Sequence, residues 1–481
     1  MGHVLVVGMG KTGASVAHWC TRQGERVTVV DTRANPPGMQ ALQAALPGAT
    51  CLAGTLGVAL VEAGEVDRIV RSPGLRPADW AALNVAAQAR GIAVEGELSL
   101  FVQALTLLRG ERGYAPIVLG VTGTNGKTTT TMLTGALIAG AGRTVAVAGN
   151  VGFPMLDTLA RHLDANTLPE VWVLELSSFQ LDGMQGFAPK AAVVLNLTQD
   201  HLDWHGSMED YARAKACIFG ARTLRVLYRH DPLVMAMQPD DLALAQTVGV
   251  DVPRQVGDYG IERVAGVDHL VRAVQGSAGV EHALLLPCSA LRIHGLHNAT
   301  NALAALALAE AAGCPIGAVR DALCAYRGEP HRVEAVGQIA DVAFFDDSKG
   351  TNVGATVAAL EGLGPQRRLI VLLGGDGKGQ DFAPLAEPVA RYARAAIVYG
   401  RDGAWIHSAL GDSAPVYEAT SLQQAVDIAG GVAQAGDAVL LSPACASFDM
   451  FDDYEHRARV FRDAVREWAD KTGHPLQELQ P

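Results

Sequence analysis

The segment IVLGVTGTNGKTTTT, residues 117–131, decides the fold class. It opens with an apolar run, 117–119, of the kind found in strands that are buried on both faces of a parallel sheet. The glycine-rich stretch from Gly120 to Thr128 follows, and it predicts a phosphate-binding loop of the GxxxxGK[ST] type. In such a loop, backbone amides and the positive end of the next helix hold a phosphate group. ATP binding is therefore the strongest local inference.

The same arrangement of an apolar run before a glycine turn occurs twice more, at 4–7 before Gly8 and at 369–373 before Gly374. Alternation of strands and helices predicts an α/β fold, and 481 residues suit three domains. Polar stretches rich in glycine and proline at 109–116 and 327–331 are candidate linkers.

We therefore expect three domains: a Rossmann-like domain at 1–112, a central P-loop ATPase-type domain with a mostly parallel sheet at 113–328, and a second Rossmann-like domain at 329–481. The segment 221–290 has irregular patterning and predicts short strands and loops inserted in the middle domain.

The composition excludes several classes of protein. Hydrophobic residues make up 49% of the chain and charged residues 18%, which is typical of globular cores. The net charge of −12 argues against a general nucleic-acid or membrane-surface binder. The seven cysteines include no CxxC pair, so we expect buried thiols in a reducing cytoplasm, and neither a disulfide framework nor a zinc site. No apolar run is long enough to span a bilayer.

A second glycine-rich turn lies near the N-terminus. Residues 8–13 match GxGxxG after an apolar run, and Asp31 follows the next run, 27–30. Alone, this pattern is the dinucleotide fingerprint of a nicotinamide-dependent dehydrogenase. Its physics, however, specifies only a pyrophosphate at a helix N-terminus, and UDP carries the same group. The residues alone leave both interpretations open.

Polar residues also follow two further apolar runs. Glu175 ends the run 171–174, and a carboxylate at the carboxyl end of a parallel strand beside the phosphate loop is well placed for Mg²⁺. His201 follows the run 192–196, but histidine is an uncommon Mg²⁺ ligand, so spacing alone leaves a structural role open. Taken alone, Lys215 is a solvated lysine on a predicted helix, and Asn150 is a turn residue.

Nine motifs follow one another along the chain: GTNGKTTT, ELSSFQLD, DHLDWH, YARAKACIF, GLHNATNALAALALA, PHRVE, DDSKGTN, GGDGKGQDF and SPACASFDMF. With them the chain resembles the Mur ligase family, three-domain enzymes that form an amide bond with ATP, and the last four motifs resemble the MurD branch most. The resemblance is weak only in about 221–290. It implies an ATP-dependent ligase that adds D-glutamate to UDP-N-acetylmuramoyl-L-alanine through an acyl phosphate in peptidoglycan precursor synthesis.

The resemblance also implies which residues carry the reaction. The catalytic residues would be Lys127, Lys215, His201 and Asn150, with Lys215 carbamylated. His201 is also a candidate base for the attacking amine. Two Mg²⁺ ions would be held by Thr128, Glu175, His201 and Lys215. ATP would be bound by Gly123, Thr124, Asn125, Gly126, Lys127, Thr128, Thr129, Asn298, Asn301, Arg332, Asp347 and Lys349.

Two further sets of residues would bind the other substrates. The UDP substrate would lie on Gly10, Lys11, Thr12, Asp31, Thr32, Arg33, Ser72, Pro73, Gly74 and Asn150. D-glutamate would lie on Thr351, Lys378, Ser447, Phe448 and Tyr454. Lysine and hydroxyl donors suit a dicarboxylate chemically. The family usually has phenylalanine at the position of Tyr454, so this chain departs from the family pattern there.

The expected partners are UDP-N-acetylmuramoyl-L-alanine, D-glutamate and ATP, with no nucleic acid and no membrane, and we expect a cytoplasmic monomer. A dehydrogenase would leave the phosphate loop and every later motif unused. A related ligase, such as folylpolyglutamate synthase or another Mur enzyme, is the second alternative, but folate-type ligases lack the UDP-binding N-terminal domain. A non-catalytic nucleotide switch is the third, and the intact Lys127, Glu175, His201 and Lys215 disfavour it.

Overall fold

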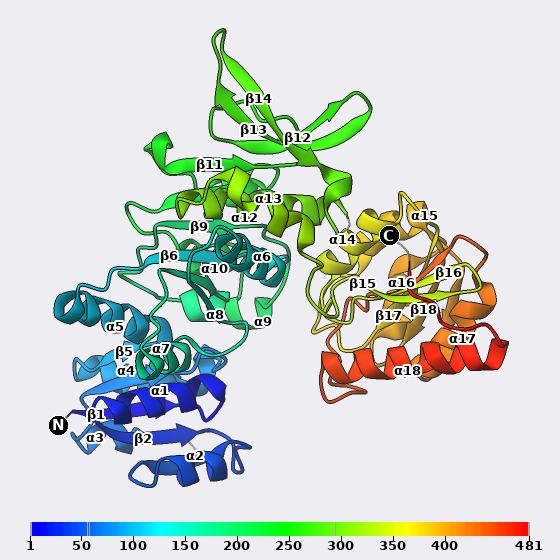
Figure 1. The fold of residues 1–481 in the computed structure, drawn as a ribbon. Helices are drawn as coiled ribbons and strands as arrows, with labels where there is room; N and C mark the ends of the chain where they lie inside the picture. The colour runs from blue at the N-terminus through cyan, green and yellow to red at the C-terminus, as the bar shows by residue number, and fades with distance from the viewer. Residues whose placement is uncertain (1, 55, 57, 294, 480–481) are drawn as a thin grey trace.

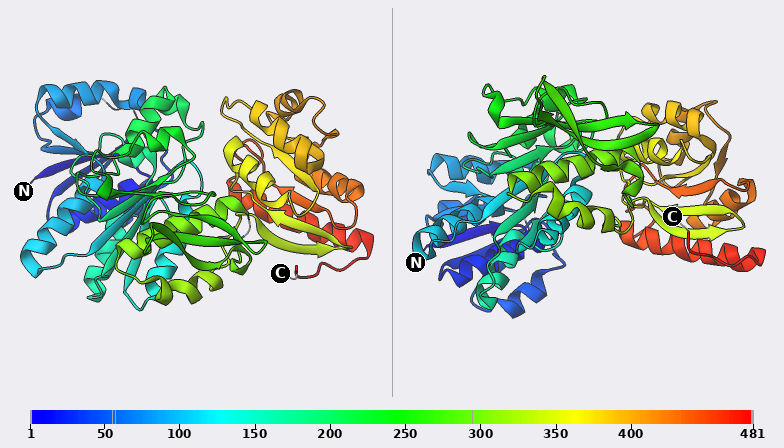
Figure 2. Two further views of the ribbon diagram at one scale, coloured as in Figure 1. Left: turned by 90° about the horizontal axis from the view of Figure 1, so that it is seen from above. Right: turned by 45° about the horizontal axis from the view of Figure 1, so that its top comes forward.

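The computed structural model describes residues 2–54, 56, 58–293 and 295–479. Within these residues the chain forms three sheets, each flanked by helices and each built from a separate stretch of the sequence (Figure 1). The middle stretch lies between the other two, and the three views agree on this arrangement (Figure 2). The predicted α/β fold of three domains with mostly parallel sheets is confirmed.

The N-terminal sheet is parallel, with the strand order β3-β2-β1-β4-β5. Its strands are short apolar runs rich in valine and isoleucine, which favour extended backbone. Because the order reverses at β1, the loops after β1 and β4 open a crevice at the carboxyl edge, where open α/β sheets bind ligands. The elements are β1 His3–Val7, α1 Lys11–Arg22, β2 Arg26–Asp31, α2 Met39–Ala45, β3 Thr50–Ala53, α3 Ala59–Glu62, β4 Arg68–Arg71, α4 Pro77–Ala89, β5 Ala93–Glu95 and α5 Glu97–Arg112.

The middle sheet has the order β14-β13-β12-β11-β10-β9-β6-β8-β7. Strand β6 lies between β8 and β9 and is parallel to both, so the carboxyl ends of these three strands meet at one edge. The first part contains β6 Ile117–Thr122, α6 Lys127–Gly140, β7 Val145–Gly149, α7 Met155–Ala165, β8 Val171–Glu175, α8 Ser178–Leu181, β9 Ala191–Val194, α9 Leu202–His205 and α10 Met208–Ala216. The almost entirely buried helix α12 Leu296–Ala311 packs on α6, and α13 Ile316–Ala325 follows it.

The segment 221–290 continues this sheet. Strands β10 and β11 extend it in parallel, and β12 to β14 add an antiparallel meander that projects from the body (Figure 1). The predicted short strands and loops are confirmed: the strands extend the middle sheet, and a loop at 249–258 separates β11 from β12. Its elements are β10 Leu224–Tyr228, α11 Pro232–Met235, η1 Leu242–Leu244, β11 Ala245–Val248, β12 Tyr259–Val264, β13 Val267–Gln275, β14 Val280–Pro287 and η2 Cys288–Ala290.

The C-terminal sheet has the order β15-β16-β20-β17-β18-β19, and only β15 is antiparallel to its neighbour. Because β16, β20 and β17 are parallel neighbours, the loops that follow them share one edge. The elements are β15 Glu334–Ile339, β16 Val342–Asp346, α14 Val353–Leu363, β17 Leu369–Gly374, η3 Ala383–Leu385, α15 Ala386–Tyr392, β18 Ala393–Tyr399, α16 Gly403–Leu410, β19 Val416–Glu418, α17 Leu422–Val432, β20 Ala438–Leu441 and α18 Tyr454–Thr472.

The first predicted linker is largely helical. Helix α5 runs to Arg112 and ends where Gly113 takes a left-handed backbone conformation (φ 66°), so the loop is only 113–116. The glycine at position 110 did not stop the helix, because the apolar face of α5 is buried up to Leu108. The second predicted linker lies in the loop between α13 and β15. Among the described residues, no helix combines the length and the apolar character that crossing a membrane requires.

Candidate active site

The central glycine loop connects β6 to α6. Gly123 has φ 146° and Gly126 has φ 80°, and a Cβ atom on Gly126 would come within 2.4 Å of Asn301 Oδ1. Side chains are therefore excluded at both positions for conformational and steric reasons. The predicted pattern needs one correction: five residues separate Gly120 from Gly126, not four, and Gly120 lies inside β6. The loop itself is Gly123–Gly126, and α6 begins at Lys127.

Lys127 is the first residue of α6, and its side chain folds back onto this loop. Its ammonium group donates to the carbonyl oxygens of Gly123 (3.0 Å) and Thr124 (2.7 Å). Burial lowers the pKa of Lys127, whereas the nearby carboxylates of Glu175 and Asp200 oppose that effect. A cation held at a helix N-terminus with a set of small loop residues can bind and neutralise phosphate oxygens.

Glu175, at the end of β8, lies beside the loop and is 2% exposed. Its Oε1 accepts a hydrogen bond from Asn150 Nδ2 (2.8 Å), and its buried Oε2 has no hydrogen-bond partner in the described part of the chain. A buried carboxylate oxygen without a donor is costly unless a cation or water satisfies it. This oxygen and the Thr128 hydroxyl, which accepts from Arg332 Nη2 at 2.9 Å, form an oxygen donor set that suits Mg²⁺.

Lys215 is buried, with 1% of its surface exposed, so the interpretation as a solvated lysine is wrong. It lies on α10, and its Nζ donates to Gly123 O (2.9 Å) and Thr122 Oγ1 (3.3 Å). Burial, followed by the charge of Lys127, lowers the pKa of Lys215 well below its usual value. The spacing did not reveal this because α10 packs its Lys215 face against the phosphate loop, which is a tertiary contact.

His201 lies in the loop after β9 and has a left-handed backbone (φ 53°). Its ring packs on Phe179 at 4.7 Å between centroids, and its Nε2 lies 3.5 Å from Asp200 Oδ2. Burial lowers the pKa of His201, and the ammonium groups of Lys378, Lys127 and Lys215 act in the same direction. The neutral imidazole favoured by these effects can accept a proton or bind a metal ion.

Asp200 and His205 of the DHLDWH motif also have contacts in this region, although they were not among the predicted site residues. Asp200 Oδ2 accepts from Asn352 Nδ2 at 3.5 Å, so it connects the middle and C-terminal sheets. His205 Nε2 lies 2.9 Å from Ser178 Oγ, and burial lowers the pKa of His205 to about 4. The motif itself was the available signal, because it places several polar residues directly after a buried strand.

Most of the predicted ATP residues line one cavity between the middle and C-terminal sheets. Asn298 and Asn301, on the buried helix α12, are joined by a 3.0 Å hydrogen bond. A neighbouring cavity of about 310 Å³ shares part of this wall. The residues around the first cavity are Asn125, Gly126, Thr129, His297, Asn298, Asn301, Arg332, Val333, Asp347, Lys349, Gly350, Ala355, Ala358 and Ala359.

Asp347 is the buried carboxylate of this cavity. Its Oδ2 accepts from Ser442 Oγ at 2.7 Å, and burial raises the pKa of Asp347 to about 7. Lys349, two residues later, donates to the Tyr454 hydroxyl at 3.2 Å. An anionic acceptor and two cations, Lys349 and Arg332, therefore surround the space next to the glycine loop.

The predicted D-glutamate residues lie on the three adjacent loops of the C-terminal sheet. The backbone of Asp376 pairs with that of Ala446, which brings the loops of Lys378 and Ser447 together. Val353 N donates to Gln380 Oε1 at 3.0 Å, which adds the loop of Thr351.

Lys378 is exposed and has φ 53°, and its charge reaches His201. The two aromatic residues predicted to contact D-glutamate differ from Thr351, Lys378 and Ser447 in their surroundings. Phe448 is 73% exposed, and Tyr454 contacts Lys349.

The N-terminal glycine loop has a different construction. Gly8 (φ 108°) lies against Ser72, whose N–H donates to Val7 O at 2.8 Å, so residues 72–74 form the second wall. Asp31 accepts from Met9 N (2.7 Å) and from the Arg33 guanidinium (2.8 Å at each oxygen). The hydrogen bonds from Arg33 lower the pKa of Asp31 to about 2. The other predicted residues here, Gly10, Lys11, Thr12, Thr32, Pro73 and Gly74, are exposed or half-buried along the same edge.

Two contacts join this N-terminal region to the middle sheet. Ser15 Oγ accepts from Asp157 N at 3.1 Å, so α1 faces α7. Asn150, which precedes α7, reaches Glu175 through its side chain and its backbone N–H (2.8 Å each). The predicted turn residue therefore orients the Glu175 carboxylate.

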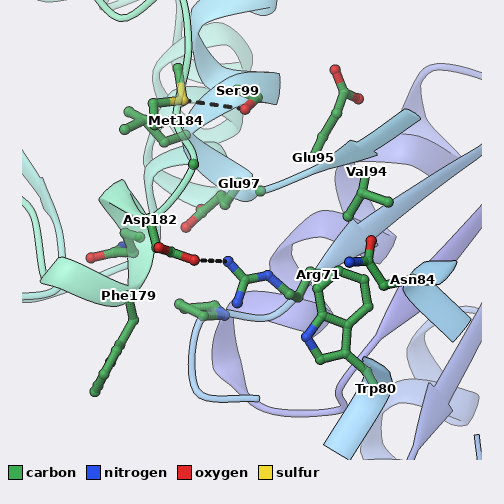
Figure 3. A pocket seen from close by; sticks show the side chains of 15 residues that line it. Arg71, Trp80, Asn84, Val94, Glu95, Glu97, Ser99, Phe179, Asp182 and Met184 are labelled. Atoms are coloured by element: carbon green, nitrogen blue, oxygen red, sulfur yellow. Dashed lines mark hydrogen bonds and ion pairs between the residues drawn. The ribbon is translucent and has the colours of Figure 1, made fainter. Parts of the chain in front are cut away.

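A further cavity of about 210 Å³ lies between α4, β5 and the segment 179–184 (Figure 3). Arg71 extends from the end of β4 to Asp182 Oδ2 at 3.4 Å, and its guanidinium lies over the rings of Trp80 and Trp204. These contacts tie the N-terminal sheet to the middle sheet beside the Ser72–Gly74 loop.

Three family models match the chain. They are described as Mur ligase MurD-like, N-terminal domain (residues 2–96), Mur ligase middle domain (121–309), and Mur ligase, glutamate ligase domain (331–445).

Relatives match over their whole length. The chain is 55% identical to the UDP-N-acetylmuramoylalanine--D-glutamate ligase of Albidiferax ferrireducens, over 100% of this chain and 99% of the relative. It is 51% identical to the enzyme of that name from Burkholderia thailandensis, over 98% of each.

Solved structures show the same fold. They include the UDP-N-acetylmuramate-alanine ligase MurC of Thermotoga maritima, with TM-score 0.58, 20% identity, and coverage of 97% of this chain and 100% of that one. The MurF ligase of Thermotoga maritima, in complex with ADP, has TM-score 0.59, 16% identity, and coverage of 96% and 98%.

Proposed function

The chain belongs to the Mur ligase family, and from that premise we propose that it joins D-glutamate to UDP-N-acetylmuramoyl-L-alanine with ATP in peptidoglycan precursor synthesis. The observation that carries this proposal is the meeting of Lys127, Glu175 and Lys215 around one glycine loop. A dehydrogenase would have no use for this second loop. We place the enzyme in the cytoplasm, as a monomer.

We propose that the N-terminal loop binds the diphosphate of the UDP substrate. The first turn of α1 offers backbone N–H groups, and the Ser72–Gly74 loop lies opposite. Asp31 and Arg33 hold each other and the Met9 N–H, so they shape the uracil end of the loop. Gly10, Lys11, Thr12, Thr32 and Pro73 would complete this surface.

ATP would lie between the middle and C-terminal sheets. Residues 123–129 would hold its phosphates, and Asn298, Asn301 and Arg332 would contact the nucleotide beside them. Asp347 can accept a hydrogen bond from a ribose hydroxyl. Its neighbour Lys349 would face the phosphates together with Lys127.

The family requires Mg²⁺, and the unpartnered oxygen of Glu175 with the Thr128 hydroxyl fits that ion. A bound Mg²⁺ supplies positive charge that stabilises the transferred phosphoryl group. We propose that a second Mg²⁺ uses His201 and a carbamylated Lys215. Burial lowers the pKa of Lys215, which favours its neutral amine. That amine would attack CO₂ through its nitrogen and lose one proton, which converts the neutral amine into an anionic carbamate.

The reaction then follows from the arrangement. The carboxylate of the UDP substrate attacks the ATP γ-phosphate, giving an acyl phosphate and ADP, while Lys127 neutralises the charge that two anions bring together. The D-glutamate amine attacks the acyl carbon, and phosphate leaves. Asn150 fixes Glu175, and His201 is a candidate to receive the proton of the amine.

D-glutamate would be held by Lys378, Thr351 and Ser447, which lie on adjacent loops. An ammonium group and two hydroxyls match the two carboxylates of this substrate. Phe448 would cover the site from its exposed position.

Phosphate release, measured with each candidate amino acid, tests the function. We expect release that requires both UDP-N-acetylmuramoyl-L-alanine and D-glutamate. Release with L-lysine or meso-diaminopimelate, but not with D-glutamate, would assign the chain to a different Mur step. Release without the UDP substrate would favour a folate-type ligase.

A further inference from the structure

Tyr454 is the first residue of α18, and the reaction described above gives its hydroxyl group no role. The hydroxyl accepts a hydrogen bond from Lys349 Nζ at 3.2 Å and donates one to Glu455 Oε1 at 3.0 Å. The Lys349 ammonium also lies 4.7 Å from the centre of the Tyr454 ring. Lys349 is therefore held both by a lone pair and by a ring face.

The direction of these hydrogen bonds is determined by the neighbours. A phenol has one proton to give, and the Glu455 carboxylate can only accept. The hydroxyl therefore turns its lone pairs toward Lys349. Burial, helped by Glu455, raises the pKa of Tyr454 to about 12, so the phenol keeps its proton at neutral pH.

The backbone segments that carry Lys349 and Tyr454 are held together. Ser348 Oγ donates to Tyr454 O at 2.8 Å, which ties the loop of Lys349 to the start of α18. The fully buried Arg457 donates to Ser348 O (2.7 Å) and Ser348 Oγ (3.0 Å), and also to Cys445 O (3.0 Å). Lys349 and Tyr454 therefore belong to one rigid unit.

Lys349 needs such an acceptor because the nearby cations Arg332 and Lys127 repel its ammonium group. Burial and the charge of Arg332 lower the pKa of Lys349, and Lys127 adds to this effect. The carboxylates of Glu175 and Glu455 act in the opposite direction. A mobile ammonium group would be repelled from the phosphate loop, which already holds Lys127 and is contacted by Arg332.

We propose that Tyr454 is a positioning residue whose phenol holds the Lys349 ammonium group toward the phosphate that is transferred. The proposal rests on the function given above, and it replaces the prediction that Tyr454 contacts D-glutamate. Phenylalanine, the usual residue of the family at this position, would provide the ring but not the hydrogen bond.

A double-mutant cycle in the full chain tests this proposal. Tyr454→Phe should lower kcat about tenfold, because a hydrogen bond to a charged group is lost, and should leave KM for D-glutamate within about twofold. In a Lys349→Met background the same change should have no further effect. Tyr417→Phe, on the surface of the same domain, serves as the matched control and should have wild-type kinetics.

Two outcomes would overturn the proposal. One is an equal loss of kcat from Tyr454→Phe with and without Lys349. The other is a rise confined to KM for D-glutamate, which would restore the acceptor contact. If Tyr454→Phe fails to fold, Glu455→Gln gives the second test, since it weakens the acceptor of the phenol proton and should lower kcat in the same direction by a smaller factor.

A titration that needs no turnover separates this proposal from the proposed function. In protein with ¹³C-labelled lysine, assigned with Lys349→Met, the Lys349 signal should titrate at lower pH in Tyr454→Phe, because the ammonium group loses an acceptor. An unchanged titration refutes the contact. If the wild-type chain shows no ligase turnover, the proposed function fails, and the titration still decides the role of Tyr454.

Discussion

The two glycine loops of this chain look alike in sequence but differ in what surrounds them. The N-terminal loop is lined mostly by exposed or half-buried residues, and its buried acidic residue, Asp31, is engaged by Arg33 and Met9 N. The central loop holds the partly buried Lys127, the buried Lys215 and a Glu175 oxygen without a donor. A loop whose charges are satisfied can bind a diphosphate without changing it. The central loop brings several charged groups close together, and bound substrates would complete the pairing of these charges. A phosphate group that reacts requires such charges around it.

Lys127→Ala gives the sharpest test of this difference. Because the side chain would neutralise charge where two anions meet, we expect kcat for ATP-dependent phosphate release to fall on the order of 1,000-fold or more. Lys190→Ala, which removes an exposed lysine of the same domain, should leave the rate unchanged. If Lys127→Ala retained its activity, the charge of Lys127 would not distinguish the central loop from the N-terminal loop.

The next largest effect is expected at Lys215. Lys215→Ala should lower kcat on the order of 100-fold, and short carboxylic acids should restore part of the activity by replacing the carbamate. Lys215→Arg, which cannot form a carbamate in this way, should be impaired and should not respond to the acids. Full activity of Lys215→Ala without additives would contradict the role given to this lysine.

Substitutions in the loops expected to bind D-glutamate should change KM instead of kcat. Lys378→Ala removes the exposed cation expected to bind a D-glutamate carboxylate, so KM for D-glutamate should rise about 10- to 100-fold while KM for ATP changes less than about twofold. Lys471→Ala, which breaks a surface ion pair with Asp427, is the control. An unchanged KM for D-glutamate would remove Lys378 from the acceptor site.

The smallest effect is expected at Asp31 of the N-terminal loop, and it concerns stability. The pKa of Asp31 is lowered to about 2 in the folded chain, below the ordinary value of 3.8, so its contribution is present above pH 4 and is lost as the pH falls toward 2. Asp31→Asn should lower the free energy of unfolding by about 1 kcal/mol at neutral pH. In urea unfolding followed by fluorescence, this difference should shrink by pH 2.5. A constant difference would show that the charge is not the cause.

The sequence determined the secondary structure around each loop because those signals are local. The apolar runs before Gly8, Gly120 and Gly374 became parallel strands. The N-terminal glycine turn lies where it was expected, whereas the central turn begins only at Gly123 because Gly120 belongs to β6. The one failed linker, 109–116, shows the limit of composition as a signal. A single glycine at position 110 was too weak to end a helix whose apolar face is buried.

Tertiary packing alone decided the state of several side chains. Lys215 is two residues from Arg213, which forms an exposed ion pair with Asp210. No local pattern shows that the Lys215 face of α10 meets the phosphate loop 92 positions earlier. Asn150 became the partner of Glu175 only because β7 and β8 are neighbours in the sheet.

The chain itself therefore specified two glycine loops, a run of parallel strands and a family, since glycine turns and strand periodicity depend on neighbouring residues. The folded structure determined which lysine is buried, which carboxylate oxygen lacks a donor, and that Tyr454 faces Lys349. Burial and charge depend on residues far away in the sequence, and so the pKa of a side chain and its partner are properties of the packed molecule.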